Sequence, residues 1–184
     1  ALAPCPSSPA SSTTSSSAST SNHVIEQSTW MYKGHPIAYE RSYIKDKVNN
    51  TDKTPILLLN GFGMGTFHQH RLMEAVHSQN VGRTIYGIDY LGQGKSWPID
   101  CDDGNSEREQ GLRYSASTWI DQIADFVTNN LQSRVHLVGN SIGGYLAVFV
   151  ASQYPDNVES VVLLNATPIW GLNLPGWSGH LPVP

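Results

Sequence analysis

A serine between two glycines is the side chain of this sequence best placed to act as a nucleophile. The run Gly139-Asn140-Ser141-Ile142-Gly143 follows a strand-like segment at 134–138 and precedes an apolar, helix-like segment at 144–154. At such a strand-to-helix turn the serine hydroxyl projects away from the sheet edge. The serine backbone adopts a sparsely populated conformation there, which persists only because the surrounding structure enforces it. The two glycines are expected because side chains there would collide with the neighbouring strand and helix. The pattern predicts Ser141 as a catalytic nucleophile.

A serine nucleophile also needs hydrogen-bond donors for the oxyanion that forms on the attacked carbonyl. The backbone N–H of Ile142, at the start of the helix-like segment, is expected to supply one. The second is expected from the glycine-rich turn at 60–63, and we assign it to the N–H of Phe62. An ordinary turn with Phe62 packed inside is the alternative. Substrate binding is assigned to Gly61, Asn140 and Trp170.

Strands and helices are expected to alternate around these turns. A hairpin with its turn at Lys33-Gly34 comes first. A continuous apolar run, typical of a strand buried in a parallel sheet, follows at 55–59, and two more buried strands are expected at 84–88 and 158–164. Helices are expected at 67–80 and after a cap at Ser117 or Thr118, the second with Ile120, Ile123, Val127 and Leu131 on its apolar side. The order predicts an α/β fold with a doubly wound, mostly parallel sheet behind an N-terminal hairpin.

The serine turn and its flanks resemble the α/β-hydrolase fold, in which the catalytic serine, acid and histidine follow in this order along the chain. After Ser141 the sequence offers Asp156, Glu159 and His180. Asp156 is expected in a helix-to-strand loop at the opposite end of the sheet, and His180 lies in a stretch rich in glycine and proline. We therefore expect the acid and the base beyond Pro184, in a longer enzyme of which this N-terminal portion is inactive alone. Earlier histidines are expected at the surface or in packing: His68, His70, His77 and His136.

Four motifs, one of which includes the serine turn, narrow the resemblance to one group within this fold. They lie, in order, at 62–68, 88–96, 139–145 and 163–171, the last reading Leu-Leu-Asn-Ala-Thr-Pro-Ile-Trp-Gly. Together they resemble the pheophytinase group of plastid α/β-hydrolases, which remove the phytyl ester from magnesium-free chlorophyll. Asn60 departs from that group, which usually has proline there. The resemblance implies a serine carboxylester hydrolase of a hydrophobic ester, namely the phytyl ester of pheophytin or of a chlorophyll derivative.

Two other functions stay open. C–C bond hydrolases of ring-cleavage products resemble the Gly-Asn-Ser-x-Gly-Gly run, although their oxyanion loop differs. A non-catalytic binding protein of the hydrolase fold would keep the serine and lack the base, as this sequence does. In an esterase, the apolar side chains after the last strand would begin a groove or lid over the serine: Trp170, Leu172, Leu174, Trp177 and Leu181.

Composition excludes several partners. The 184 residues carry a net charge of −4 and no basic run, so neither nucleic acid nor an anionic membrane is expected to bind. No apolar stretch is long enough to cross a bilayer. Cys5 and Cys101 are expected to be free thiols. The pair His68-x-His70 would diverge around a helix, and the acidic loop at 100–109 does not fit a calcium loop, so neither a metal nor a cofactor is expected.

Three segments are expected along the chain. Residues 1–27 form a disordered presequence or linker rich in Ser, Thr, Ala and Pro, 28–171 the N-terminal part of the hydrolase domain, and 172–184 the start of a cap or lid. Residues 1–22 carry no charge and resemble a plastid transit peptide; a plain flexible tail is the alternative. The sequence thus favours a plastid location, with peripheral association at the thylakoid membrane, over a cytoplasmic one.

Overall fold

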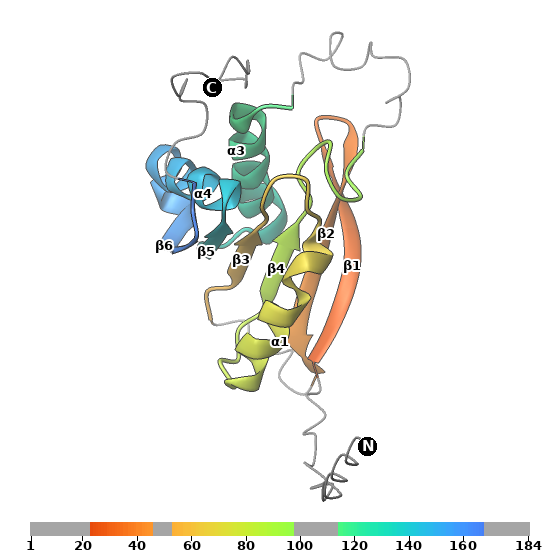
Figure 1. Cartoon of the computed structure of the whole chain (residues 1–184), viewed down its shortest axis with the longest axis vertical. Coiled ribbons are helices and arrows are strands. Elements are labelled where there is room, and N and C mark those ends of the chain that lie inside the picture. The colour runs from red at the N-terminus through yellow and green to blue at the C-terminus, as the bar shows by residue number, and fades with distance from the viewer. Residues whose placement is uncertain (1–22, 46–52, 98–113, 168–184) are drawn as a thin grey trace, which may run out of the picture.

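A mixed sheet organises the chain in the computed structural model, which describes residues 23–45, 53–97 and 114–167 (Figure 1). Its spatial order is β1-β2-β4-β3-β5-β6. Strands β3, β4, β5 and β6 run parallel, whereas β1 and β2 join antiparallel at one side. The strands are β1 (His23–Tyr32), β2 (His35–Ile44), β3 (Ile56–Leu59), β4 (Ile85–Ile88), β5 (Val135–Asn140) and β6 (Val158–Leu164). The expected α/β-hydrolase architecture, with a mostly parallel sheet behind a hairpin, is confirmed.

Strands β1 and β2 form the expected hairpin. Lys33 and Gly34 both have positive φ, 47° and 84°, which suits a tight two-residue turn. Pairing extends from Tyr32–His35 at the turn to His23–Ile44 at the open end. Residues 23–27 therefore belong to β1 and not to the segment expected before the domain. The β-branched side chains of Val24 and Ile25 favour this extension.

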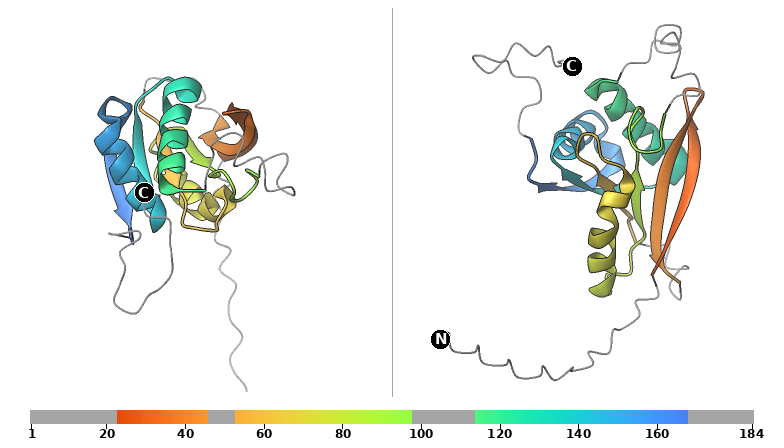
Figure 2. Two further views of the ribbon diagram at one scale, coloured as in Figure 1. Left: turned by 90° about the horizontal axis from the view of Figure 1, so that it is seen from above. Right: turned by 45° about the vertical axis from the view of Figure 1, so that its right-hand side comes forward.

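Helices cover both faces of the sheet (Figure 2). On one face α1 (His70–Ser78), preceded by the short helix η2 (Thr66–Gln69), packs Met73 against Leu58. On the other face α3 (Ala116–Asp125) and α4 (Ile142–Gln153) pack against Leu57 and Leu59. A π-helical turn η3 (Phe126–Leu131) extends α3, and η4 (Pro155–Asn157) links α4 to β6. The side chains of β3 alternate between two buried faces, as its continuous apolar run predicted.

The cap of α3 differs from the expected one. Ser115, not Ser117 or Thr118, precedes the helix, and its hydroxyl accepts the N–H of Thr118 at 3.3 Å. The helix begins earlier because Ala116 and Trp119 are buried, at 2% and 3% exposure, which draws the first turn onto the sheet. The earlier start brings Trp119 and Gln122 to the loop after β4, where both make hydrogen bonds.

Strand β6 has the expected bounds, but the expectation that it is buried is wrong. Val162 and Leu163 remain about half exposed, at 47% and 50%. Among the described residues β6 pairs with β5 alone, so its other edge and part of its faces lack a neighbour. The residue types at 158–164 therefore predicted a strand correctly but did not predict which elements cover it. No helix within the described ranges is long and apolar enough to cross a membrane.

Candidate active site

Ser141 lies at the sharp turn between β5 and α4, at the carboxyl end of the parallel strands. Its backbone has φ 54° and ψ −120°, a conformation that L-residues rarely adopt and that the surrounding structure must hold. The flanking glycines explain how such a turn can pack. A Cβ on Gly139 would lie 2.3 Å from the carbonyl oxygen of Gly143, and one on Gly143 would lie 2.3 Å from that of Leu59. Both positions therefore exclude a side chain, as the sequence pattern indicated.

The segment after β6 holds the serine turn from the side. The N–H of Ser141 donates to the carbonyl of Leu164 at 3.2 Å, and its own carbonyl accepts the N–H of Thr167 at 3.0 Å. The hydroxyl oxygens of Ser141 and Thr167 lie 3.4 Å apart. Sequence reasoning missed Thr167 as a site residue, although it belongs to the Asn-Ala-Thr-Pro motif that supported the family resemblance.

The glycine-rich turn after β3 lies directly against the serine. A Cβ on Gly61 would be 3.6 Å from the Cβ of Ser141 and 3.4 Å from the Oδ1 of Asn140. The N–H of Met64 donates to the carbonyl of Gly61 at 3.3 Å and closes the turn around Phe62. The structure thus brings Gly61, Asn140 and Ser141 together.

The two expected oxyanion donors come from segments that meet at Ser141. Ile142 is the first residue of α4 and is buried, and amides of a first helical turn have no acceptor within their own helix. Phe62 lies in the turn beside Gly61 with 61% of its surface exposed, so the alternative of an inward-packed Phe62 does not hold. Its ring centroid is 6.3 Å from that of Trp119 on α3. This arrangement suits a hole between the loop after β3 and the start of α4.

Asn60 links the ends of β3 and β4. Its side-chain Nδ2 donates to the carbonyl of Ile88 at 3.1 Å, and its backbone carbonyl accepts a hydrogen bond from the hydroxyl of Tyr90 at 3.1 Å. Tyr90 is completely buried, and this burial raises the pKa of its phenol, which therefore stays a donor. Among the described residues nothing pairs with the buried Oδ1 of Asn60. Asparagine at this position thus anchors the glycine-rich turn through its side chain.

Asp89, at the end of β4, ties the loops after β3 and β4 together. Its carboxylate oxygens accept the N–H of Thr66 and the N–H of Lys95, both at 2.7 Å. Burial raises the pKa of this carboxyl, and the two backbone bonds act against that rise. Gly94 is required here because its Cβ would lie 2.2 Å from an Asp89 oxygen. Asp89 therefore has a structural role.

Two carboxylates that follow Ser141 in the sequence lie at the opposite end of β6, as was expected for Asp156. Glu159, at the beginning of β6, pairs with Arg134 at 2.9 Å, whereas Ser141 adjoins the other end of that strand. Asp156 lies in η4, also before β6. Within the described part of the chain, no histidine or carboxylate hydrogen-bonds the Ser141 hydroxyl. Trp170 and His180 lie outside the described residues.

The histidines before the serine have other partners. His77 is buried on α1 and its ring bonds the hydroxyl of Ser42 at 2.9 Å. His70 pairs with Glu40 at 2.6 Å. The Nδ1 of His136 lies 2.8 Å from the hydroxyl of Ser160.

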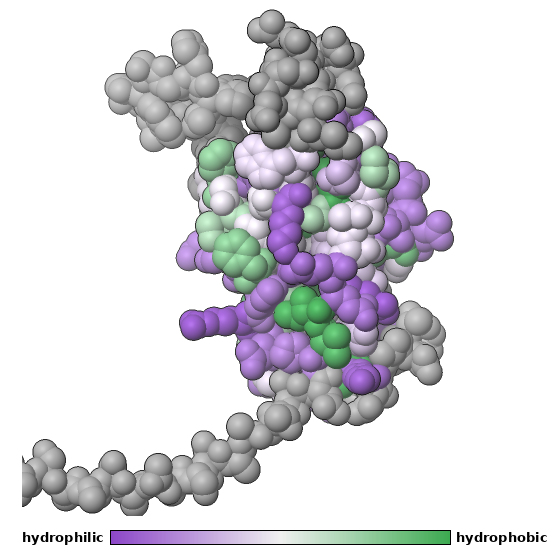
Figure 3. All heavy atoms as spheres, turned by 90° about the vertical axis from the view of Figure 1, so that its right-hand side faces the viewer, coloured by the Kyte–Doolittle hydropathy of each residue, from purple (hydrophilic) through white to green (hydrophobic). Residues whose placement is uncertain are grey.

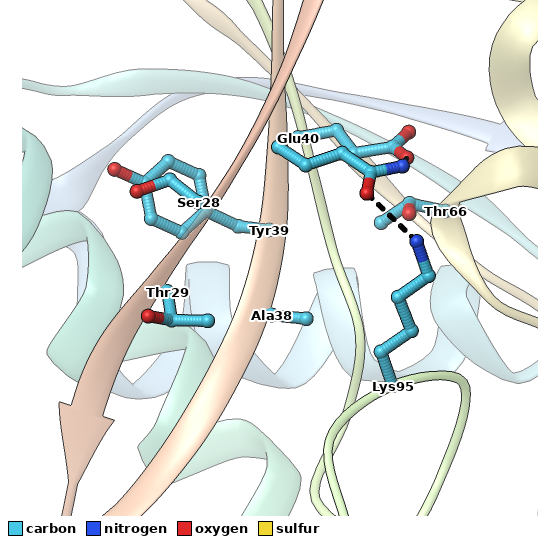
Figure 4. A pocket seen from close by; sticks show the side chains of 8 residues that line it. Ser28, Thr29, Ala38, Tyr39, Glu40, Thr66 and Lys95 are labelled. Carbon is cyan, nitrogen blue, oxygen red and sulfur yellow. Dashed lines mark hydrogen bonds between the residues drawn. The ribbon is translucent and has the colours of Figure 1, made fainter.

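A polar hollow of about 390 Å³ lies away from the serine, beside the β1–β2 hairpin (Figure 4). Lys95 reaches over it to the Oε1 of Gln27 at 2.8 Å, and the Nε2 of Gln27 donates to Glu40 at 2.9 Å. Its charged and amide groups thus bond one another. The face of the molecule that carries the hairpin is mostly hydrophilic (Figure 3).

The amino-acid sequence is similar to known families and proteins. A family model described as alpha/beta hydrolase fold matches residues 54–182. The chain is 34% identical to a chloroplastic pheophytinase of Arabidopsis thaliana over 151 residues, 70% of this chain and 30% of that protein. It is 28% identical to a proline iminopeptidase of Lactobacillus delbrueckii subsp. bulgaricus, over 80% of this chain and 48% of that protein.

Solved structures share the fold. A thioesterase domain from the curacin biosynthetic pathway matches with a TM-score of 0.61 at 19% identity, over 78% of this chain and 47% of that one. A membrane phospholipase A described as a bacterial virulence factor matches with a TM-score of 0.62 at 21% identity, over 79% of this chain and 41% of that one. The chain thus spans about a third to a half of the length of these four proteins.

Proposed function

Because the chain belongs to the alpha/beta hydrolase fold family, we propose that it supplies the nucleophile and oxyanion hole of a serine carboxylester hydrolase. The observation that carries the proposal is Ser141, held at φ 54° between β5 and α4 with the Gly61 turn against it. A serine in a strained turn, flanked by backbone N–H groups of the loop after β3 and of the start of α4, is typical of a nucleophile that attacks a carbonyl carbon.

In the proposed reaction the Oγ of Ser141 attacks the ester carbonyl and passes its proton to a histidine outside the described residues. The carbonyl oxygen becomes an oxyanion and accepts the N–H groups of Ile142 and Phe62. Each such donor is typically worth about 2.7–4 kcal/mol in the transition state. The C–O bond to the alcohol then breaks, the alcohol leaves with the proton, and water hydrolyses the acyl-enzyme by the same route.

The substrate proposed is a hydrophobic ester, namely the phytyl ester of pheophytin or of a chlorophyll derivative. Similarity to a chloroplastic pheophytinase supports this choice, as do the motifs shared with that group. The exposed ring of Phe62 offers an apolar contact beside Gly61, and Gly61 and Asn140 lie close enough to Ser141 to contact the acyl group. Trp170 and the segment from 172, which lie outside the described residues, are proposed to begin the groove or lid over the serine. The same similarity, to a protein described as chloroplastic, supports a plastid location. Peripheral contact with the thylakoid membrane is part of the proposal.

Proline iminopeptidase relatives support a second candidate reaction, removal of an N-terminal proline from a peptide. It would use the same serine and oxyanion hole on an amide. A polar, charged substrate amine would then need a carboxylate near the serine. Such a carboxylate, like the acid and the histidine of the esterase, would come from outside the described residues. We rank ester hydrolysis first because the identity to the pheophytinase, 34%, is higher than that to the proline iminopeptidase, 28%.

The test uses the protein expressed from its complete coding sequence. Hydrolysis of pheophytin is followed by chromatography of the released phytol and free acid, beside chlorophyll, a proline arylamide and short p-nitrophenyl esters. We expect pheophytin to react faster than chlorophyll, Ser141→Ala to abolish turnover and the matched Ser133→Ala, at an exposed serine, to leave it unchanged. Turnover of short esters or of the arylamide alone would exclude the pheophytin assignment. Failure of a fluorophosphonate to label Ser141 would leave the non-catalytic alternative in its place.

A further inference from the structure

Gln93 is a buried side chain on the loop after β4. It lies within the motif at 88–96, but its residue type suggested no role there. It is 5% exposed, and its backbone is held on both sides. Its N–H donates to the carbonyl of Tyr90 at 2.8 Å, and its carbonyl accepts the N–H of Ser96 at 2.9 Å. The N–H of Gly92 also donates to the carbonyl of Ser96, at 2.7 Å. The side chain of Gln93 therefore projects from a closed loop whose backbone is fixed.

This side chain reaches the turn that carries the expected oxyanion donor. Its Oε1 accepts the N–H of Gly63 at 2.7 Å. Gly63 follows Phe62 directly and has φ +74°, a conformation that glycine adopts without a steric penalty. The bond connects two loops that lie 30 residues apart in the sequence.

The planarity of the peptide unit relates these hydrogen bonds to the orientation of the Phe62 N–H. The carbonyl of Gly61 and the N–H of Phe62 belong to one planar trans unit, so they point in opposite directions. The Gly61 carbonyl is turned toward the N–H of Met64, which directs the Phe62 N–H away from the interior of the turn. The next peptide unit carries the N–H of Gly63, which Gln93 holds. The turn is thus fixed on both sides of Phe62.

The other end of the Gln93 amide shows why a glutamine is present. Its Nε2 is buried, and among the described residues it has no hydrogen-bond acceptor. An unpaired buried donor destabilises a fold, so an apolar side chain of the same size would serve packing better. What an apolar side chain cannot supply is an acceptor for Gly63.

We propose that Gln93 is a positioning residue that orients the Phe62 amide for the oxyanion. The inference rests on the proposed function, since it names the support of the same site. Asp89 also joins these two loops, through Thr66 and Lys95, but it acts beyond the turn that contains Phe62.

Gln93→Met tests the inference because it keeps the side-chain length and removes the acceptor. The matched control is Gln122→Met. Gln122 is a buried glutamine that accepts the N–H of Leu91 at 2.8 Å and donates to the carbonyl of Asp89 at 3.0 Å, in the same loop. In the full protein we expect Gln93→Met to lower kcat for a p-nitrophenyl ester about tenfold or more, with KM changed less than about threefold. The amide of Gly63 should exchange with deuterium faster, and Ser141 should react more slowly with a fluorophosphonate.

Gln122→Met should lower thermal stability at least as much, because it loses two bonds, while kcat and the exchange of Gly63 stay near those of the wild type. Equal loss of kcat in both variants, or wild-type kcat in Gln93→Met, would overturn the positioning role and leave the proposed function intact. A wild-type protein that neither hydrolyses esters nor reacts at Ser141 would overturn both.

Discussion

Ser141 and Thr167 are joined through both backbone and side chain. The N–H of Thr167 donates to the carbonyl of Ser141 at 3.0 Å, and their hydroxyl oxygens are 3.4 Å apart. Because Ser141 is held at a sparsely populated φ, something must oppose its relaxation. Part of that restraint comes from the segment that follows β6, so the nucleophile depends on a strand that follows it by some twenty residues.

Gly144→Ala is expected to weaken this restraint. A Cβ on Gly144 would lie 2.4 Å from the Cβ of Ala166, the neighbour of Thr167, so the segment after β6 must move. We expect the free energy of unfolding to fall by about 1–3 kcal/mol, the usual cost of overpacking, although alanine is ordinarily the better helix residue. Urea unfolding measures the stability, and the rate of Ser141 phosphonylation reports on the turn.

Ala166→Gly provides the control, since it removes the atom that the new methyl group meets. The double variant should recover most of the stability and reactivity lost in Gly144→Ala, with a favourable coupling between the two sites. Simple additivity of the two single changes would show that the contact does not transmit the effect.

Gly61→Ala should separate folding from catalysis. Its Cβ would meet Asn140 and Ser141 at 3.4 and 3.6 Å, ordinary contact distances, and Gly61 is not among the glycines with positive φ. Stability should therefore change by less than about 1 kcal/mol. The methyl group would occupy space beside the nucleophile, so kcat/KM for a bulky ester should fall at least about tenfold.

The matched change for this prediction is Gly63→Ala. It adds a methyl group where nothing lies within 4 Å, but at φ +74°, so it should lower stability more than Gly61→Ala does. Equal rates for bulky and short esters in Gly61→Ala would contradict the placement of the acyl group beside Gly61.

Features governed by adjacent residues could be predicted from the sequence. The glycines two positions before and after Ser141 indicate the sharp turn there. The pair Lys33-Gly34 indicates the hairpin turn in the same way. The strand at 158–164 was located correctly because β-branched and apolar residues predominate in it. Its exposure was not predictable, because burial depends on which elements pack against a strand and not on the strand itself.

Features that depend on distant partners could not be predicted. Gln93 is an unremarkable residue in a common loop motif until folding brings it to Gly63. Asn60 was noticed as a departure from the family pattern, but its bond to Ile88 follows from the adjacency of β3 and β4. The sequence favoured Ser117 or Thr118 as the cap of α3, whereas the burial of Ala116 and Trp119 makes the helix begin directly after Ser115.

The buried ring of His77 is expected to make the free energy of unfolding depend on pH. Burial, and then the charge of neighbouring His23, lower the pKa of His77 below its ordinary 6.5. The folded state therefore favours the neutral ring, and the unfolded chain takes up the proton first. The stability that this residue contributes is present above about pH 6.5 and declines as the pH falls through that value toward the lower folded pKa.

We expect the free energy of unfolding, measured in urea, to decrease between pH 7 and pH 5 and to decrease less steeply in His77→Gln. His68→Gln, at an exposed histidine just before α1, is the control and should leave the slope unchanged. An identical slope in His77→Gln and the wild type would show that the buried ring is not a source of the acid sensitivity.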